Sequence, residues 1–182
     1  MKKILICLSF FVLASFSSNA QMLKFGIKGG VNFSDFGGSD AKNFNSEMLT
    51  GFHVGALVEF NVFENLSLQP EIMYSAHGAK IKDVNVDDIN LNYITVPVLA
   101  KFYVITDKLS LEAGPQFSFL INESVPDQFE SKSFDFAAVG GLGFYFTKNV
   151  FAQARYVAGL TDTTKDAKIN NQVIQLSIGY RF

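Results

Sequence analysis

The last twelve residues, Asn171 to Phe182, alternate strictly between two kinds of side chain, and this pattern constrains the fold more than any other feature. Successive side chains of a β-strand point to opposite sides, so every second residue lies on the same face. One face is apolar throughout, and it carries Ile174, Leu176, Ile178, Tyr180 and Phe182. The other face is mixed and includes Gln175 and Arg181. A strand with one face in lipid and the other in a polar interior needs this pattern, so the segment is typical of a membrane-spanning β-strand.

Similar two-residue alternation recurs along the chain and predicts eight strands. Their expected ranges are 23–33, 51–62, 66–76, 91–104, 108–120, 134–147, 149–160 and 171–182. The connections alternate between long polar segments (34–50, 77–90, 121–133 and 161–170) and very short turns. Long loops on one side and tight turns on the other are typical of outer-membrane barrels. The sequence therefore predicts an all-β fold, an eight-stranded antiparallel up-and-down transmembrane β-barrel.

The N-terminus has the features of a secretory signal peptide over residues 1–20. Lys2 and Lys3 precede an apolar stretch, and a small-residue cleavage site ends at Ala20. The apolar stretch is too short to span about 30 Å of hydrocarbon as a helix. Residues 21–182 would then form one barrel domain. Removal of the peptide would also remove Cys7, the only cysteine, so neither a disulfide nor a thiolate metal site is expected.

The composition argues against nucleic acid as a partner. Without Lys2 and Lys3 the chain has 13 basic and 17 acidic residues, which is no basic footprint. The chain nevertheless has 48% hydrophobic residues, among them 20 phenylalanines. No apolar run after the signal peptide is long enough for a spanning helix. Apolar surface must therefore be separated from polar surface by strand alternation.

Aromatic residues stand at both ends of the apolar strand faces, with aliphatic or small residues between them. This order predicts two aromatic girdles at the membrane interfaces. The expected interface residues are Phe52, Phe60, Phe134, Phe136, Phe144, Phe146 and Tyr180. A secreted soluble β-protein is the alternative, and it would bury the same face in a core.

The opposite strand faces carry charged residues of both signs. The expected inward charges are Lys24, Lys28, Glu59, Glu71, Lys101, Glu112, Asp135, Arg155 and Arg181. An eight-stranded barrel is just wide enough for its interior side chains to fill the lumen. Because buried charges are tolerated when paired, these residues predict an ion-pair network that plugs the barrel. Lys101 and Glu112 face each other across a tight turn and are expected to pair. The alternative is that this face is merely solvated.

Three prolines conflict with a regular barrel. Pro70, Pro97 and Pro115 fall inside expected strands, where each removes a backbone hydrogen-bond donor. Local bulges, or strand ends that lie earlier than drawn, would reconcile them with the fold.

Catalytic and metal-binding candidates are weak. Ser75 and His77 share a strand face, and His53 could lie nearby, but Glu71 is about 13 Å from Ser75 along the strand. A hydrolase needs a nucleophile, a base and an orienting group in contact, so no enzymatic activity is expected. Three loop aspartates (83, 87 and 88) lack calcium-loop spacing, and no metal or cofactor is expected.

Several segments resemble the PorT-like outer-membrane β-barrel ("porin family") proteins. The matching pieces are LKFGIKGGVNFS (23–34), NYITVPVLAKFYV (92–104), LSLEAGPQFSFLI (109–121), FDFAAVGGLGFYF (134–146), RYVAGLTD (155–162) and QLSIGYRF (175–182). In size the chain is similar to OmpA- and OmpX-type barrels. The resemblance implies location in the outer membrane of a Gram-negative bacterium. Phe182 resembles the terminal signal read by the barrel-assembly machinery, which would then be a partner.

The function expected from these features is a plugged barrel in contact with outer-membrane lipids. It would have a structural or interaction role, with an unknown ligand or protein at its four long extracellular loops. The first alternative is a narrow porin-like channel for water, ions or small solutes. A lipid-modifying enzyme that uses Ser75 and His77 is a more remote one.

Overall fold

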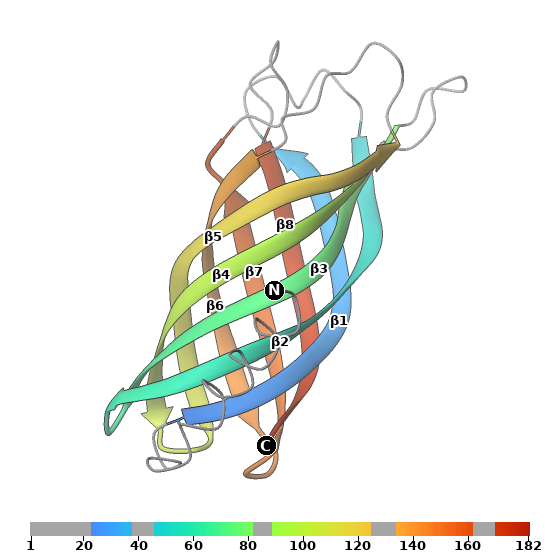
Figure 1. The fold of residues 1–182 in the computed structure, drawn as a ribbon. Coiled ribbons are helices and arrows are strands. Elements are labelled where there is room, and N and C mark those ends of the chain that lie inside the picture. Colours follow the sequence, from blue (N-terminus) through green and yellow to red (C-terminus); the bar gives the residue numbers. More distant parts are fainter. Residues whose placement is uncertain (1–22, 38–45, 82–88, 125–133, 162–169) are drawn as a thin grey trace, which may run out of the picture.

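A computed structural model of the chain describes residues 23–37, 46–81, 89–124, 134–161 and 170–182. These residues form eight strands in a closed barrel, each antiparallel to its neighbours, with β8 paired to β1 (Figure 1). The strands are β1 (Leu23–Gly37), β2 (Ser46–Phe63), β3 (Leu66–Ile81), β4 (Ile89–Ile105), β5 (Leu109–Ser124), β6 (Phe134–Tyr145), β7 (Val150–Gly159) and β8 (Asn170–Arg181). The predicted all-β barrel is confirmed. The described residues include no helix of the length and hydropathy that a membrane span requires.

Six strands run further toward the long connections than the alternation predicted. Residues expected in loops belong to strands at 34–37, 46–50, 77–81, 89–90, 121–124 and 170. Backbone pairing continues there, as between Gly37 and Asn170. Polar residues occur on both faces of these extensions, so the alternation of apolar and polar residues stops there. The backbone hydrogen bonds between the strands nevertheless continue.

The three tight connections lie at the end of the barrel that also holds the C-terminus, here called the turn end (Figure 1). In the β4–β5 turn, the Lys108 N–H donates to the carbonyl of Ile105 at 3.0 Å. Asp107 in this turn has a positive φ of 55°, a conformation that aspartate tolerates better than most residues. The opposite end, toward the long connections, is called the loop end.

The outward face of the wall is the apolar face of the alternation. Phe52, Phe60, Phe134 and Phe144 are exposed on it, and Phe136 is half-buried on the same face. Phe52 and Phe60 are eight residues apart, which corresponds to about 20 Å along the barrel axis at a strand tilt of about 40°. That distance approaches the height of the apolar band of outer-membrane barrels. The large apolar residues thus form a belt around the barrel and leave the interior to other side chains.

The aromatic residues at the two ends of this belt contact one another. Near the loop end the Phe52 and Tyr74 rings are 5.6 Å apart. At the turn end, Tyr180 contacts Phe182 at 5.3 Å, and Phe144 contacts Phe146 at 5.2 Å. The exposed rings therefore gather at two heights along the barrel, and their place at membrane interfaces stays a prediction.

The prolines lie within continuous strands, at neither bulges nor strand ends, so both explanations considered from the sequence are wrong. At Pro70, Pro97 and Pro115 the pairing with the preceding strand is interrupted and then resumes in the same register. The unpaired positions are 58–59 opposite 69–70, 71–72 opposite 96–97, and 98–99 opposite 114–115. Since proline has no backbone N–H, each interruption includes one position that offers no backbone hydrogen-bond donor. We call this oblique line across β2–β5 the proline seam.

Close approach of neighbouring strands requires glycine at Gly30. A Cβ added there would lie 1.9 Å from the carbonyl oxygen of Leu176 on β8. Backbone atoms of a paired strand cannot move aside as a flexible side chain can. Gly140 differs, because an added Cβ there would meet no atom within 4 Å.

We therefore expect Gly30→Ala to destabilise the folded barrel by about 1–3 kcal/mol through overpacking. Gly140→Ala is the matched control and should leave stability nearly unchanged. Urea unfolding in detergent micelles measures both variants against the wild type. Equal midpoints for the two variants would contradict the close approach of β1 and β8.

Candidate functional site

The centre of the lumen is filled by a cluster of buried charged side chains from four strands. Glu71 on β3 lies 2.8 Å from Lys28 Nζ on β1 and 2.8 Å from Arg155 Nη2 on β7. The same Arg155 Nη2 is 2.7 Å from Oε2 of Glu112 on β5. Arg155 therefore bridges two carboxylates that belong to non-adjacent strands of the barrel.

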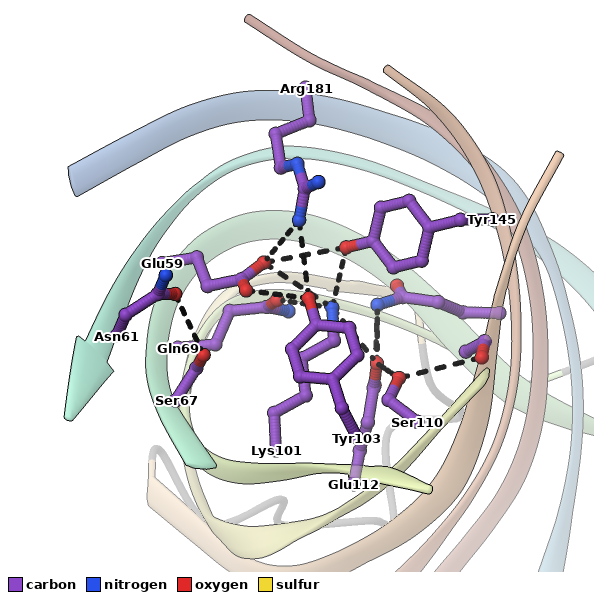
Figure 2. Close-up of polar contacts among 12 residues, drawn as sticks. Glu59, Asn61, Ser67, Gln69, Lys101, Tyr103, Ser110, Glu112, Tyr145 and Arg181 are labelled. Atoms are coloured by element: carbon purple, nitrogen blue, oxygen red, sulfur yellow. Dashed lines mark hydrogen bonds and ion pairs between the residues drawn. The ribbon is translucent and has the colours of Figure 1, made fainter. Parts of the chain in front are cut away.

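A second cluster nearer the turn end continues this network. Lys101 Nζ on β4 is 3.5 Å from Glu112 Oε1 and 3.5 Å from Glu59 Oε2. Arg181 Nη1 on β8 is 3.2 Å from the same Glu59 oxygen. Figure 2 shows these side chains converging from the surrounding strands. Seven charged residues thus form one continuous chain of ion pairs: Lys28, Glu59, Glu71, Lys101, Glu112, Arg155 and Arg181.

The predicted pair of Lys101 and Glu112 occurs, but each residue has a closer partner. The two residues are directly opposite in the β4–β5 register. Lys101 Nζ donates to the hydroxyl of Tyr145 at 2.7 Å, a shorter contact than its ion pair with Glu112. Glu112 is closest to Arg155. The spacing in the sequence indicated the facing pair, whereas partners across the lumen depend on how the barrel closes.

Lys24 and Asp135 were expected in the ion-pair network, and the structure corrects both. Lys24 is half-buried at the start of β1 and makes no ion pair with any described residue. Asp135 is buried near the loop end, where it accepts hydrogen bonds from Thr161 Oγ1 and from Asn171 Nδ2. Asp135 therefore lies away from the network, whereas Lys24 lies directly opposite Glu59 in the β1–β2 register but forms no ion pair with it.

Aromatic side chains that sequence reasoning missed enclose Lys101. Its Nζ lies 4.8 Å from the centre of the Tyr145 ring, 5.4 Å from that of Tyr103 and 5.9 Å from that of Phe151. Cation–π attraction is strongest where the cation is shielded from water, as this buried lysine is. The Tyr103 hydroxyl also donates to Glu59 at 2.6 Å (Figure 2). Both tyrosines lie on the strand face that carries the charged residues, and this position in the alternation could have identified them from the sequence.

The network spans the proline seam. Glu59 and Glu71 both occupy unpaired positions of the seam. Their carboxylates are bound by Arg181, Lys28 and Arg155, which belong to β8, β1 and β7. Salt bridges across the lumen therefore connect the interrupted wall of β2–β5 to the regular wall on the other side.

A separate polar cluster occupies the lumen nearer the loop end. Asn32 Nδ2 donates to Ser75 Oγ at 2.9 Å, and Ser75 Oγ lies 2.8 Å from His77 Nε2. His53 contacts Asn32 Oδ1 at 2.8 Å and Ser177 Oγ at 2.7 Å. The lumen also holds an apolar group on β4 and β6–β8, made of Leu99, Ala137, Val139, Val157 and Val173.

Ser75 and His77 have the spacing of a nucleophile and a base, but the arrangement is incomplete. Glu71 is held by Lys28 and Arg155, and no carboxylate of the described residues contacts His77. Catalysis of this kind needs a third group that orients the base. The pair is also buried inside the barrel wall.

No group of metal-ligating side chains occurs among the residues that the structure describes. The three loop aspartates considered for a cation (83, 87 and 88) lie outside them, as do the expected signal peptide and residues 38–45, 82–88, 125–133 and 162–169 of the long connections.

Comparisons with known proteins agree with the fold. A family model described as "Outer membrane protein beta-barrel domain" matches residues 15–165. No curated protein sequence matches the chain. Among solved structures, Ail of Yersinia pestis is similar with 19% identity and a TM-score of 0.56, covering 87% of this chain and 98% of that chain. Another structure of Ail is a complex with the heparin analogue sucrose octasulfate.

Two further structures are similar to a comparable degree. Neisserial surface protein A has 18% identity and a TM-score of 0.56, over 86% of this chain and 95% of that chain. OprG from Pseudomonas aeruginosa has 14% identity and a TM-score of 0.55, over 87% of this chain and 95% of that chain. At these identities the likeness concerns the fold.

The central network predicts a large effect of removing Arg155. In Arg155→Met, Glu71 loses one of its two cations and Glu112 loses its closest one, so we expect a loss of about 3–5 kcal/mol. Lys108→Met is the control, since Lys108 is exposed in the β4–β5 turn and makes no ion pair with a described residue, and it should change stability little. The temperature at which the folded gel band converts to the unfolded band measures both. Equal temperatures for the two variants would contradict the structural role of the network.

Proposed function

Because this chain belongs to the outer membrane protein β-barrel domain family, we propose that it is an integral barrel with a plugged lumen, acting through its long extracellular connections. Its role would be surface contact or maintenance of envelope integrity. The observation that supports this most directly is the chain of buried ion pairs that joins seven residues across the lumen.

Several finer properties belong to the same proposal. Residues 1–20 would direct export across the inner membrane of a Gram-negative bacterium and be removed. The barrel-assembly machinery would recognise Phe182, whose side chain is exposed beyond the end of β8. Within the family we favour a PorT-like member, on the strand motifs described above.

Closure of the lumen is supported by the contents of its turn-end half. The rings of Tyr103 and Tyr145 project into the barrel around Lys101, beside the carboxylates of Glu59 and Glu112 (Figure 2). An eight-stranded barrel has little interior beyond its own side chains. A diffusion pore would require this network to separate, and its charges would then be left unpaired.

The charge of the connections suggests the kind of partner. Residues 34–50, 77–90, 121–133 and 161–170 contain eleven acidic and six basic residues. A polyanion such as the heparin analogue in the Ail complex would meet a net negative charge here. A partner with a positive or neutral surface is therefore favoured.

We propose no catalytic role. Ser75 and His77 face the interior and are buried, so the barrel wall separates them from membrane lipid. Their contacts with Asn32 and Tyr93 are those of a packed polar cluster.

The closed lumen predicts no stable conductance for the wild-type barrel in planar bilayers. The double variant Glu71→Gln with Arg155→Met removes the central bridge, and we expect it to show more frequent open events. Lys108→Met serves as the control with the network intact. A reproducible open level in the wild type would favour the narrow channel instead.

Shortening the connections should remove the function without unfolding the barrel. Variants trimmed within 38–45, 82–88, 125–133 or 162–169 leave all eight described strands intact. We expect heat-modifiable gel mobility to persist, while detergent resistance is not restored in a deletion strain. Full restoration by the barrel with all four trims would contradict a role of the connections.

Lipid mass spectra from a His77→Ala strain should match the wild type, as a non-enzyme requires.

A further inference from the structure

Two adjoining hollows lie on the outer wall over β7, β8 and β1. The first has a volume of about 610 Å³, and the second has a volume of about 470 Å³. Side chains of the first hollow include Val31, Leu109, Leu142, Phe144, Ala152, Ala154, Leu176 and Ile178. Those of the second include Ile27, Val54, Val150, Ile178 and Tyr180. Gly29 and Ile178 border both.

The strand register explains the shape of this surface. Phe144, Ala152, Ile178 and Gly29 follow one another across β6, β7, β8 and β1 as directly paired residues. Large and small side chains therefore alternate along the row. Ile178, whose residue is 68% exposed, forms a ridge with a small residue on each side. The result is two troughs separated by one side chain.

Both troughs lie at the depth of hydrocarbon in the turn-end half of the wall. Phe144 and Tyr180 belong to the aromatic girdle at the turn end, and Val31 and Leu176 lie further toward the middle of the barrel. The one charged residue among the lining, Lys28, directs its side chain into the lumen, where it pairs with Glu71. An occupant of the troughs must therefore be apolar along its length.

Positive charge stands at the turn end of the troughs. Lys108 directly precedes Leu109, and Lys148 is two residues before Val150, so each lies beside a residue that lines a hollow. Both lysines are exposed. The neighbouring Asp107 carboxylate is 3.9 Å from Arg181 Nη2, which offsets its charge. A negatively charged headgroup would be attracted to this position.

We propose that this face binds one phospholipid of the leaflet at the turn end, with its two acyl chains on either side of Ile178 and its phosphate near Lys108 and Lys148. The inference rests on the membrane placement proposed above. A second copy of the barrel fits less well. A stable protein interface buries about 1,200–2,000 Å², and a convex barrel wall would touch the Ile178 ridge without filling the floor of the troughs.

Native mass spectrometry tests the proposal on the intact barrel. The protein is reconstituted in bilayers of phosphatidylethanolamine and phosphatidylglycerol, extracted into mild detergent and weighed. We expect the wild type to retain one phospholipid, and Ala152→Leu with Ala154→Leu to lose it because the floor of the first trough is filled. Ala100→Leu with Ala113→Leu is the matched control, since these alanines are also on the outer face of the wall and line neither hollow.

The headgroup site has its own variant. Lys108→Gln with Lys148→Gln should lower retention roughly tenfold without affecting the troughs. Equal retention in the wild type, the filled variant and the control would overturn the proposal. A wild-type mass of two barrels that the filled variant loses would also overturn it, in favour of a second copy.

A second measurement does not depend on the filled variant folding. The chain has no tryptophan, so a single introduced tryptophan reports one position. The Phe144→Trp substitution lies on the rim of the first hollow, whereas Phe60→Trp lies in the same girdle away from both hollows. With lipids brominated in the acyl chain, we expect fluorescence quenching in the Phe144→Trp variant to persist after transfer to detergent. In the Phe60→Trp variant we expect the quenching to vanish.

Loss of quenching in both tryptophan variants would overturn the proposal. A wild type that fractionates with membranes but keeps no lipid would also overturn it, while leaving the proposed function standing. The failure of this inference and the failure of the proposed membrane location are therefore distinguishable.

Discussion

A backbone in hydrocarbon has no water with which to form hydrogen bonds, so its strands must pair with each other all the way round. The closure of β8 onto β1 meets this requirement, and the rest of the structure follows from it. Closure divides the side chains into an outward set and an inward set. It also makes each interruption of the ladder costly, since the neighbouring strand cannot turn to solvent for a replacement partner.

The proline seam is such an interruption, and the ion-pair network lies directly behind it. Glu59 and Glu71 stand at unpaired positions, and cations from the opposite wall bind both. The network therefore has two consequences from one set of contacts. It fills the lumen, and it ties the interrupted strands to the regular ones. Buried salt bridges do not always stabilise a fold, but removing one partner leaves a charge that nothing else in the interior can compensate.

The outer wall also combines large side chains with small ones. Aromatic residues stand at the two ends of the belt, while small residues such as Ala152 and Ala154 leave troughs between larger neighbours. A wall of uniform side chains would offer lipid a smooth surface. In our proposal, these troughs and the lysines at the turn end form the site of one phospholipid.

The sequence by itself determined the strand count, the inward and outward faces and the facing pair of Lys101 and Glu112, because these depend on a two-residue period and on neighbours along a hairpin. Tertiary structure decided which charges meet across the lumen. Arg155 joins Glu71 and Glu112, from strands far apart in the chain, while Lys24 and Asp135 fall outside the network. It also decided how the prolines fit and where the wall is hollow. These features depend on the stagger between all eight strands after closure, and no local pattern of residues records that stagger.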